Sequence, residues 1–391
     1  MVEIESLYSD FLNERDEQSL KRQLIHVEQA DSCSITVKGR NYNNFSSNDY
    51  LGLSKHPKLI RGAQDWAQKY GAGSGASRLV TGNIEPFNEL EDKIAQFKEC
   101  ESALIMVSGY QSNVSIIPAL FDQKVLKQKP IVFSDKLNHA SMHAGCAAAG
   151  ITQTRYRHND IDHLKELLEK HKDDSAPKFI LTESIFSMDG DIAPLDDIKK
   201  LAKEYNCFTI IDEAHATGVF GENGQGLAKG FDVVIGTFSK AMGSFGAYVA
   251  CSKKIKDYLV NKCGGLIYAT ALPPTVLGSI DAALSLVPTM NDERHKLHGM
   301  SEYVRQKCKK MGFDTAASTT QIIPIIMGDP ETALSFSNHL KENNIWINAI
   351  RPPTVPKNEA RLRVVLSSAH TADQIDHLLH AISQFRFSKA A

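Results

Sequence analysis

Two short apolar runs between residues 207 and 246 end in polar side chains: Cys207-Phe-Thr-Ile-Ile-Asp-Glu-Ala-His215 and Val233-Val-Ile-Gly-Thr-Phe-Ser-Lys-Ala-Met-Gly243. Such runs are typical of buried parallel strands that carry functional groups at their carboxyl ends. Ligands bind at that edge of open α/β sheets. The pattern therefore predicts that Asp212, His215 and Lys240 face one crevice.

The polar side chains of this stretch suit one cofactor. A lysine amine condenses with carbonyl groups once its pKa is lowered. A carboxylate keeps the pyridine nitrogen of pyridoxal 5'-phosphate (PLP) protonated. The hydroxyls of Thr237 and Ser239 suit a phosphate or a phenolic oxygen. Taken alone, a strand-end Asp is more often a helix cap and a single Lys is more often solvated, so the structural interpretation of Asp212 and Lys240 stays open here.

Two other nucleotide-binding interpretations of the glycine-rich and acidic segments fail. Asp212-Glu-Ala-His215 is the acidic box of helicase-type ATPases, but the phosphate loop G-x-x-x-x-G-K-[ST] that such enzymes require is missing. Gly71-Ala-Gly-Ser-Gly75 lacks the G-x-G-x-x-G spacing of a dinucleotide loop and follows Gln68-Lys-Tyr70 instead of an apolar strand.

Composition indicates a cytoplasmic globular protein of two domains. The chain has 391 residues, 42% hydrophobic and 23% charged, and a net charge of −2 that gives no electrostatic case for nucleic acid or an anionic membrane surface. Seven scattered cysteines without a C-x-x-C pair favour reduced thiols. The acidic start, Met1-Val-Glu-Ile-Glu-Ser6, is unlike a signal peptide. No run approaches the ~20 apolar residues of a membrane span.

Strands and helices alternate between about residues 100 and 255, which predicts a largely parallel sheet covered on both faces. Strands are expected at Ala103–Val107, Ile131–Phe133, Lys178–Thr182, Phe208–Ile211, Val233–Ile235 and Ala247–Cys251. The tail reads as a small α+β unit with helices near 292–311 and 331–343, strands at Ile322–Ile326, Ile345–Ile350 and Arg361–Leu366, and a helix from Thr371. At the other end, Ile4, Leu7, Tyr8, Phe11 and Leu12 recur at helical spacing, which predicts an amphipathic arm docked on another domain or subunit.

Several loops carry candidate binding groups. Ser108-Gly-Tyr110 follows a strand and opens a helix, a ready phosphate site. His139 and His143 are four apart, but no third metal ligand of suitable spacing accompanies them, so stacking of an imidazole on a planar cofactor is preferred to a metal. The glycine-rich residues 71–82 predict either a mobile linker or a loop packed on a ligand or partner. Asn48 in its loop, and the strand-end residues Arg351 and Arg363, fit ligand contacts and purely structural roles equally well.

The chain resembles the α-oxoamine synthases, PLP-dependent enzymes of aminotransferase class II. Six motifs carry the resemblance: Gly73-Ser-Gly-Ala-Ser-Arg-Leu-Val-Thr-Gly-Asn83, Asn138-His-Ala-Ser141, Phe186-Ser-Met-Asp-Gly-Asp191, Asp212-Glu-Ala-His-Ala-Thr-Gly218, Thr237-Phe-Ser-Lys240 and Ile350-Arg-Pro-Pro-Thr-Val-Pro356. The resemblance implies the PLP-dependent transferase fold type I. This fold has an arm (residues 1–50), a large PLP-binding domain with a mostly parallel seven-stranded sheet (51–275) and a smaller C-terminal α+β domain (276–391). Ala76 departs from the glycine common in that loop.

The resemblance also implies site roles. Lys240 would hold PLP and move protons at the substrate α-carbon, Asp212 would pair with the pyridine nitrogen, and His139 would stack on the ring. The other implied cofactor contacts are Gly109, Tyr110, Ser187, His215, Thr237 and Ser239, with Thr270 reaching the phosphate in the neighbouring subunit of a homodimer with shared active sites. Arg363 would bind the amino acid carboxylate. Arg22, Asn48, His139 and Thr354 would lie near substrate, although Lys21 matches the first of these positions as well.

The activity implied is a decarboxylative condensation of L-alanine with pimeloyl-CoA or pimeloyl-carrier protein, in biotin biosynthesis. Within the family, a sister enzyme that uses glycine or another acyl-CoA is the alternative. A catalytically silent subunit of the same fold is a further alternative, which the presence of Lys240, Asp212 and His139 disfavours. The missing dinucleotide loop disfavours a dehydrogenase.

Overall fold

The computed structural model describes residues 3–386, which form two compact units. Unit 1 combines the residues up to Tyr50, Met188–Gly190 and the residues from Lys296 onward, whereas unit 2 combines Leu51–Ser187 and Asp191–His295. The domain division expected at residues 50 and 275 stays a prediction. The outermost residues of its first and third segments lie outside those described.

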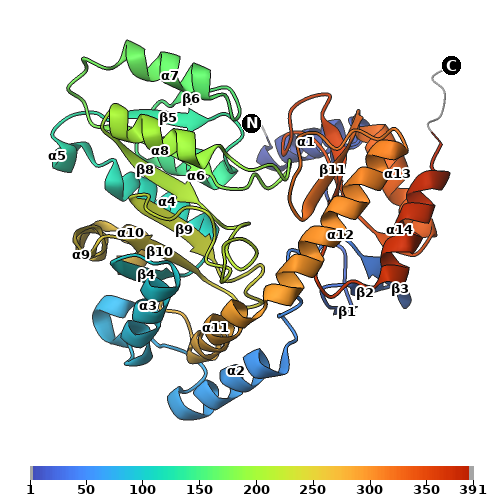
Figure 1. The fold of residues 1–391 in the computed structure, drawn as a ribbon, viewed down its shortest axis with the longest axis horizontal. Helices are drawn as coiled ribbons and strands as arrows, with labels where there is room; N and C mark the ends of the chain where they lie inside the picture. The colour runs from blue at the N-terminus through green and yellow to red at the C-terminus, as the bar shows by residue number, and fades with distance from the viewer. Residues whose placement is uncertain (1–2, 387–391) are drawn as a thin grey trace. The chain divides into compact units, whose positions relative to one another are not determined.

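Unit 2 is built on a seven-stranded sheet (Figure 1). Its order is β4 (Ser102–Met106), β10 (Ala247–Cys251), β9 (Val233–Thr237), β8 (Cys207–Asp212), β7 (Lys178–Glu183), β5 (Ile131–Asp135) and β6 (Thr154–Tyr156). From β9 to β6 all neighbours run parallel, and β10 is antiparallel to both of its neighbours. This mostly parallel α/β sheet confirms the expected fold class.

Unit 2 also contains helices, some of which pack against the sheet and form its buried core. They are α2 (Pro57–Tyr70), α3 (Pro86–Phe97), α4 (Gly109–Leu120), α5 (Gln123–Leu126), α6 (Ala140–Ala148), α7 (Ile161–Lys170), α8 (Leu195–Glu204), α9 (Lys253–Lys262), α10 (Gly264–Ile267) and α11 (Pro274–Leu286). Apolar residues of β4, β8 and β9 pack with α4 and α6 in one buried cluster that includes Leu104, Ile117 and Ile210. α4 and α6 approach closely because Gly145 has no side chain: a Cβ there would lie 2.6 Å from the carbonyl oxygen of Asn113.

The glycine-rich loop after α2 is an ordered part of unit 2. Ser77 and Thr270 form an isolated antiparallel bridge, and the Ser74 hydroxyl donates to the carbonyl oxygens of Ala271 (2.8 Å) and Leu272 (2.7 Å). A single π-helical turn (η1, Arg78–Gly82) continues the loop. The loop therefore packs on the chain's own segment before α11, and its expected packing on a ligand or partner subunit stays a prediction.

Unit 1 contains two small sheets. The first has the order β1 (Gln29–Ala30), β2 (Ser34–Val37), β3 (Arg40–Asn44) and β12 (Ile345–Trp346), and the second the order β11 (Ile322–Gly328), β14 (Ala360–Val365) and β13 (Ala349–Ile350). The single strand expected at Ile345–Ile350 is wrong. Residues 345–346 pair in parallel with β3, whereas residues 349–350 pair antiparallel with β14, so the run divides between two sheets.

The helices of unit 1 are α1 (Ile4–Glu17), α13 (Pro330–Glu342) and α14 (Ala372–Gln384), while α12 (Asn291–Lys310) begins in unit 2 and ends in unit 1. α1 confirms the expected N-terminal helix. Its apolar side chains are exposed, from 48% for Leu12 to 65% for Tyr8. The docking of this helix on another domain or subunit stays a prediction.

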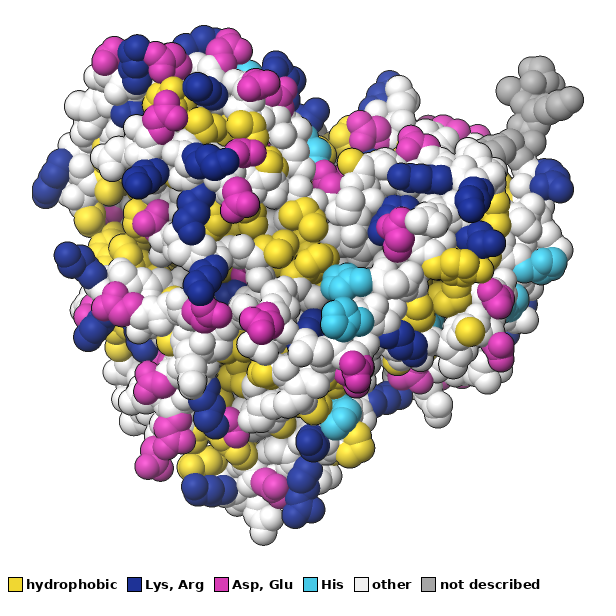
Figure 2. Space-filling view, in the orientation of Figure 1, with side chains coloured by type: hydrophobic (Ala, Val, Ile, Leu, Met, Phe, Trp, Pro, Cys, Tyr) yellow, Lys and Arg dark blue, Asp and Glu magenta, His cyan; other side chains and the backbone are white. Residues whose placement is uncertain are grey.

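Charge is spread over the surface. Figure 2 shows lysine, arginine, aspartate and glutamate side chains intermingled on the face in view, and the whole chain has 44 basic and 46 acidic residues. Within residues 3–386, every helix is too short or too polar to cross a lipid bilayer.

Candidate active site

Asp212 lies at the carboxyl end of β8, in the middle of the unit 2 sheet, and is 6% exposed. Its Oδ1 accepts a hydrogen bond from the backbone N–H of Ala214 (2.9 Å), and its Oδ2 accepts from Nδ2 of Asn113 on α4 (2.7 Å). Each carboxylate oxygen has a further lone pair. The carboxylate is thus oriented from both sides and can still accept one more donor.

Lys240 lies in the turn that follows β9, the strand next to β8. Its Nζ is 2.9 Å from Nε2 of His215. Backbone bonds close the turn, from Gly243 to the carbonyl of Lys240 (2.9 Å) and from Phe238 to the carbonyl of Gly246 (3.0 Å). Gly243 has a φ of 62°, where a side chain would strike Leu53, so this turn requires glycine. The predicted meeting of Lys240 and His215 at one sheet edge is therefore observed.

Hydroxyls and a helix N-terminus lie beside this turn. The Thr237 hydroxyl is 2.7 Å from that of Ser239 and donates to the carbonyl of Gly246 (2.9 Å). A Cβ on Gly109, the first residue of α4, would lie 3.8 Å from Cβ of Thr237. Because helix N-termini and hydroxyls both favour anions, this corner of unit 2 suits a phosphate group.

His139 caps α6 at its N-terminus. Its Nδ1 lies 2.6 Å from the hydroxyl of Ser141, which accepts a bond from Nδ2 of Asn113 (2.9 Å). The ring of Tyr110, 56% exposed, stands edge-on to the imidazole at 6.4 Å between centroids. Partial loss of water lowers the pKa of His139, and the charges of Lys240 and His143 add to this effect, against an opposing effect of Asp212. The neutral imidazole is therefore favoured.

Glu183 is a buried acid that the sequence patterns did not single out. It ends β7 directly beside Asp212, is 3% exposed, and its Oε1 has no hydrogen-bond partner among the described residues. Burial raises the pKa of Glu183 well above its usual value, and the nearby charge of Asp212 raises it further. The neutral form of Glu183 is therefore favoured beside Asp212.

A histidine clamp holds the loop that begins at Ser187. His158 lies between two carboxylates, with Nδ1 3.1 Å from Asp135 and Nε2 2.8 Å from Asp191. Burial by itself lowers the pKa of His158, but the hydrogen bonds to both carboxylates outweigh burial and raise it to about 10. The backbone N–H of Phe186 donates to the carbonyl of Asp191 (3.1 Å), so the two ends of the Ser187 loop are tied together in unit 2.

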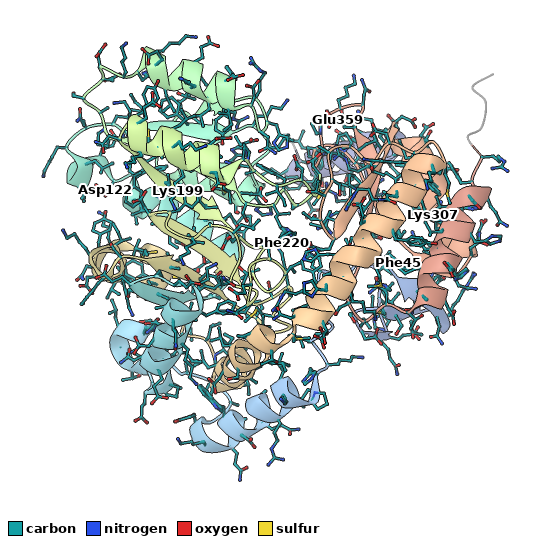
Figure 3. The ribbon with its side chains drawn as sticks, in the orientation of Figure 1. Phe45, Asp122, Lys199, Phe220, Lys307 and Glu359 are labelled. Carbon is teal, nitrogen blue, oxygen red and sulfur yellow. The ribbon has the colours of Figure 1, made fainter. Side chains whose placement is uncertain are left out.

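Unit 1 holds a second group of predicted residues. Arg363 on β14, 8% exposed, donates from Nη1 to Oδ1 of Asn48 (3.0 Å), and the Tyr50 hydroxyl donates to the same oxygen (3.1 Å). Val365 donates to the carbonyl of Phe45 (2.9 Å), which aligns the Asn48 segment along β14. Phe45 is labelled in Figure 3. The structure therefore brings Asn48 and Arg363 together.

The N-terminal candidates lie on the proline loop of unit 1. Arg22 donates from Nη2 to the hydroxyl of Thr354 (2.8 Å), whereas Lys21 pairs with Asp16 (3.7 Å). Arg351 binds the carbonyl oxygens of Ser19 and Lys21, so it anchors this segment. Thr270 belongs to unit 2, where it is exposed in the bridge with Ser77.

Residues 3–386 contain no group of three His, Cys, Asp or Glu side chains that could hold a metal ion. His143, the partner considered for His139, is instead 2.8 Å from Oε1 of Gln153.

Known proteins match this chain over nearly its full length. The sequence model of aminotransferase class I and II matches residues 40–382. An 8-amino-7-oxononanoate synthase of Gluconacetobacter diazotrophicus is 46% identical over 387 residues, 98% of this chain and 97% of the relative. A serine palmitoyltransferase of S. paucimobilis with bound PLP–myriocin superposes with a TM-score of 0.91 at 26% identity, covering 98% of both chains. An 8-amino-7-oxononanoate synthase of Francisella tularensis gives 0.75 at 29% identity, covering 88% of this chain and 97% of that one.

Proposed function

Because the chain belongs to the aminotransferase class I and II family of PLP-dependent enzymes, we propose that it condenses L-alanine with pimeloyl-CoA or pimeloyl-carrier protein. The products are 8-amino-7-oxononanoate, CO₂ and CoA or free carrier protein, in biotin biosynthesis. The full-length relatives named 8-amino-7-oxononanoate synthase support this substrate pair. The observation that carries the proposal is the buried Asp212 carboxylate at the end of β8 beside the Lys240 turn that follows β9.

The residues of unit 2 fit PLP. Asp212 retains acceptor capacity for a protonated ring nitrogen, and the corner formed by Gly109, Thr237 and Ser239 suits the phosphate. PLP supplies an electron-accepting ring that stabilises negative charge at the substrate α-carbon. The remaining proposed contacts are Lys240 with the cofactor aldehyde, His139 with the ring face, Ser187 and His215 with the phenolic oxygen, Tyr110 near the phosphate, and Thr270 with the phosphate of a neighbouring subunit.

Lys240 is proposed as the group that removes the α-proton of L-alanine and later returns a proton. Its Nζ contacts His215 at 2.9 Å, which holds the amine at the sheet edge, and the closed turn limits its motion. His215 therefore orients the base. Asp212, held by Asn113 and Ala214, would keep the ring nitrogen protonated throughout.

The substrate carboxylate is assigned to Arg363. A guanidinium recognises a carboxylate through two parallel N–H donors, and the hydrogen bond from Nη1 of Arg363 to Asn48 fixes its orientation. Arg22 and Thr354, already hydrogen-bonded to each other, are proposed near the acyl substrate. His139 is proposed near both substrate and cofactor.

The proposed reaction makes one carbon–carbon bond. The α-carbon of alanine, after losing its proton, bonds to the thioester carbonyl carbon, and the carbon–sulfur bond breaks to release the thiol. The bond from the α-carbon to its carboxylate then breaks, CO₂ leaves, and a proton replaces it. One thiol and one CO₂ are therefore released per turnover.

Amino acid preference tests the substrate assignment. Purified holoenzyme is incubated with pimeloyl-CoA, pimeloyl-carrier protein or acetyl-CoA, each paired with L-alanine, glycine or L-serine, and thiol release and ¹³CO₂ from the 1-¹³C amino acid are measured. L-Alanine should give the highest kcat/KM. A preference for glycine with a short acyl-CoA would move the assignment to a sister synthase such as 2-amino-3-ketobutyrate CoA ligase, and no release with any pair would indicate a silent subunit.

The working unit is proposed to be a cytoplasmic homodimer with shared active sites. Thr270, exposed on unit 2, is the residue proposed to act across the interface. Mixing an inactive Lys240→Ala protomer with an inactive Thr270→Ala protomer tests this, because a shared site restores activity in the mixed dimer. Independent protomers would give no restoration.

A further inference from the structure

Asn113 joins two groups of the proposed cofactor site. It lies on the second turn of α4, is 1% exposed, and carries no role in the sequence patterns. Its Nδ2 donates one hydrogen to Oδ2 of Asp212 (2.7 Å) and the other to the Ser141 hydroxyl (2.9 Å). One amide nitrogen thus contacts both the strand-end carboxylate and the helix that His139 caps.

The orientation of this amide is set by its neighbour. An ionised carboxylate only accepts hydrogen bonds, so turning the amide would place Oδ1 of Asn113 against Oδ2 of Asp212. In the observed orientation, Oδ1 has no hydrogen-bond partner among residues 3–386. Leaving a buried carbonyl oxygen unpaired destabilises the folded state. The two bonds to Nδ2 must offset that cost.

Ser141 links Asn113 to His139 through two hydrogen bonds. Its hydroxyl accepts from Asn113, so its single hydrogen is free to point to Nδ1 of His139 at 2.6 Å. The backbone N–H of Ser141 also points to Nδ1, at 3.3 Å. Nδ1 therefore accepts, and the ring proton of the neutral imidazole lies on Nε2.

We propose that Asn113 is a positioning residue that fixes the Asp212 carboxylate and, through Ser141, holds His139 as the neutral Nε2–H tautomer. The tautomer is a property of the protein, and only its effect on turnover rests on the proposed function. A single change at residue 113 therefore alters both groups, whereas a change at Ser141 alters His139 alone.

Three variants separate these effects. Asn113→Ala removes both bonds, and Ser141→Ala removes only the branch to His139. Ser112→Ala is the matched control, since Ser112 is buried on the same helix and its hydroxyl bonds to the carbonyl of Ser108 (2.8 Å). Thermal unfolding followed by circular dichroism checks that each variant is folded, and Ser141→Ala still tests the tautomer if Asn113→Ala fails to fold.

The first readout is the tautomer. Holoenzyme labelled with ¹⁵N-histidine is examined by two-bond ¹H–¹⁵N correlation spectroscopy, with the His139 signals assigned by their loss in His139→Asn. Wild type and Ser112→Ala should show protonated Nε2, and Asn113→Ala and Ser141→Ala should show a mixture of tautomers or a raised His139 pKa. Unchanged His139 signals in both variants would overturn the proposal.

The second readout separates Asp212 from His139. The affinity for PLP and the visible spectrum of the bound cofactor between pH 6 and 10 are measured for each variant. Asn113→Ala should weaken PLP binding about tenfold and shift the spectral titration, while Ser141→Ala should leave both within twofold. Equal behaviour of Asn113→Ala and wild type would contradict the Asp212 branch. Because neither readout uses turnover, loss of the condensation reaction in the wild type would count against the proposed function alone.

Discussion

Nζ of Lys240 and Nε2 of His215 lie 2.9 Å apart, although the two residues follow different strands of the unit 2 sheet. The loops meet closely here, since a Cβ on Gly218 would lie 2.7 Å from Cβ of Ala241. A basic amine and an imidazole in contact form a compact unit for proton movement at the sheet edge. We propose this pair as the reactive centre of the enzyme.

His215→Phe should lower kcat for thiol release about 10²-fold, because it removes the nitrogen that contacts Nζ of Lys240 while keeping an aromatic ring. Exchange of the α-proton of L-alanine with deuterated water should slow in parallel. His143→Gln, whose imidazole contacts Gln153 instead, is the control. A kcat within twofold of wild type would contradict the assignment of His215 as an orienting residue.

Glu183→Gln should be nearly neutral for stability, within about 1 kcal/mol by urea unfolding, because burial and Asp212 keep this acid protonated and an amide has its shape. If Glu183→Gln destabilises the protein by several kcal/mol, Glu183 is ionised in the native state.

Asp212→Asn, by contrast, should retain some PLP and lose α-proton exchange at least 10²-fold.

Asp212 and Glu183 show which part of the candidate site can be predicted from the sequence. The sequence indicates Asp212 as a candidate because it ends an apolar strand within a motif, whereas Glu183, which ends β7 in the same way, carries no predicted role. The sequence does not show that β7 and β8 are neighbouring strands. The contact between the two acids, and its effect on the pKa of Glu183, can therefore be recognised only once the order of strands in the sheet is known. Asn113 was missed for a related reason, since a helix residue is known to face a strand end only once the helix is packed.

The sequence patterns also do not predict the direction of each strand in the sheet or the division of one apolar run between two sheets. The apolar run at Ala247–Cys251 was expected as a strand, but its antiparallel direction follows from pairing between β9 and β4. The run at 345–350 is apolar except for Asn348, and it divides because its two ends meet different partners. The sequence predicts which polar residues follow a strand. It does not predict which strands pair, because pairing depends on residues far apart in the chain.

Arg363→Lys should raise KM for L-alanine about 10²-fold and change kcat less, because an ammonium cannot replace the planar, bidentate recognition of a carboxylate. The contact with Asn48 would be weakened at the same time. KM for the acyl thioester serves as the internal control and should stay within threefold. A selective rise in the thioester KM would place the arginine at the other substrate.

Stability should fall as pH rises from 7 to 10, in part because of His158. Its pKa is about 10 in the folded protein and about 6.5 when unfolded. The folded state therefore binds the extra proton, and this stabilisation is fully present below pH 6.5 and lost as the pH passes 10. His158→Gln should cost about 3 kcal/mol at pH 7 and flatten the dependence.

Urea unfolding at several pH values measures this effect. His171→Gln is the control, because its imidazole is more exposed and its contact with Asp174 is longer, at 3.4 Å. The control should keep the wild-type slope between pH 7 and 10. A slope unchanged in His158→Gln would show that the clamp is not protonated.

Covalent attachment of PLP to Lys240 is the central claim, and chemical trapping measures it directly. The holoenzyme is reduced with sodium borohydride, digested and mapped by mass spectrometry, with Lys240→Ala treated in parallel. The pyridoxyl label should be found on the peptide that contains Thr237-Phe-Ser-Lys240 and should be absent from the variant, which should also release no thiol. A label on another lysine, or thiol release by Lys240→Ala, would contradict the account.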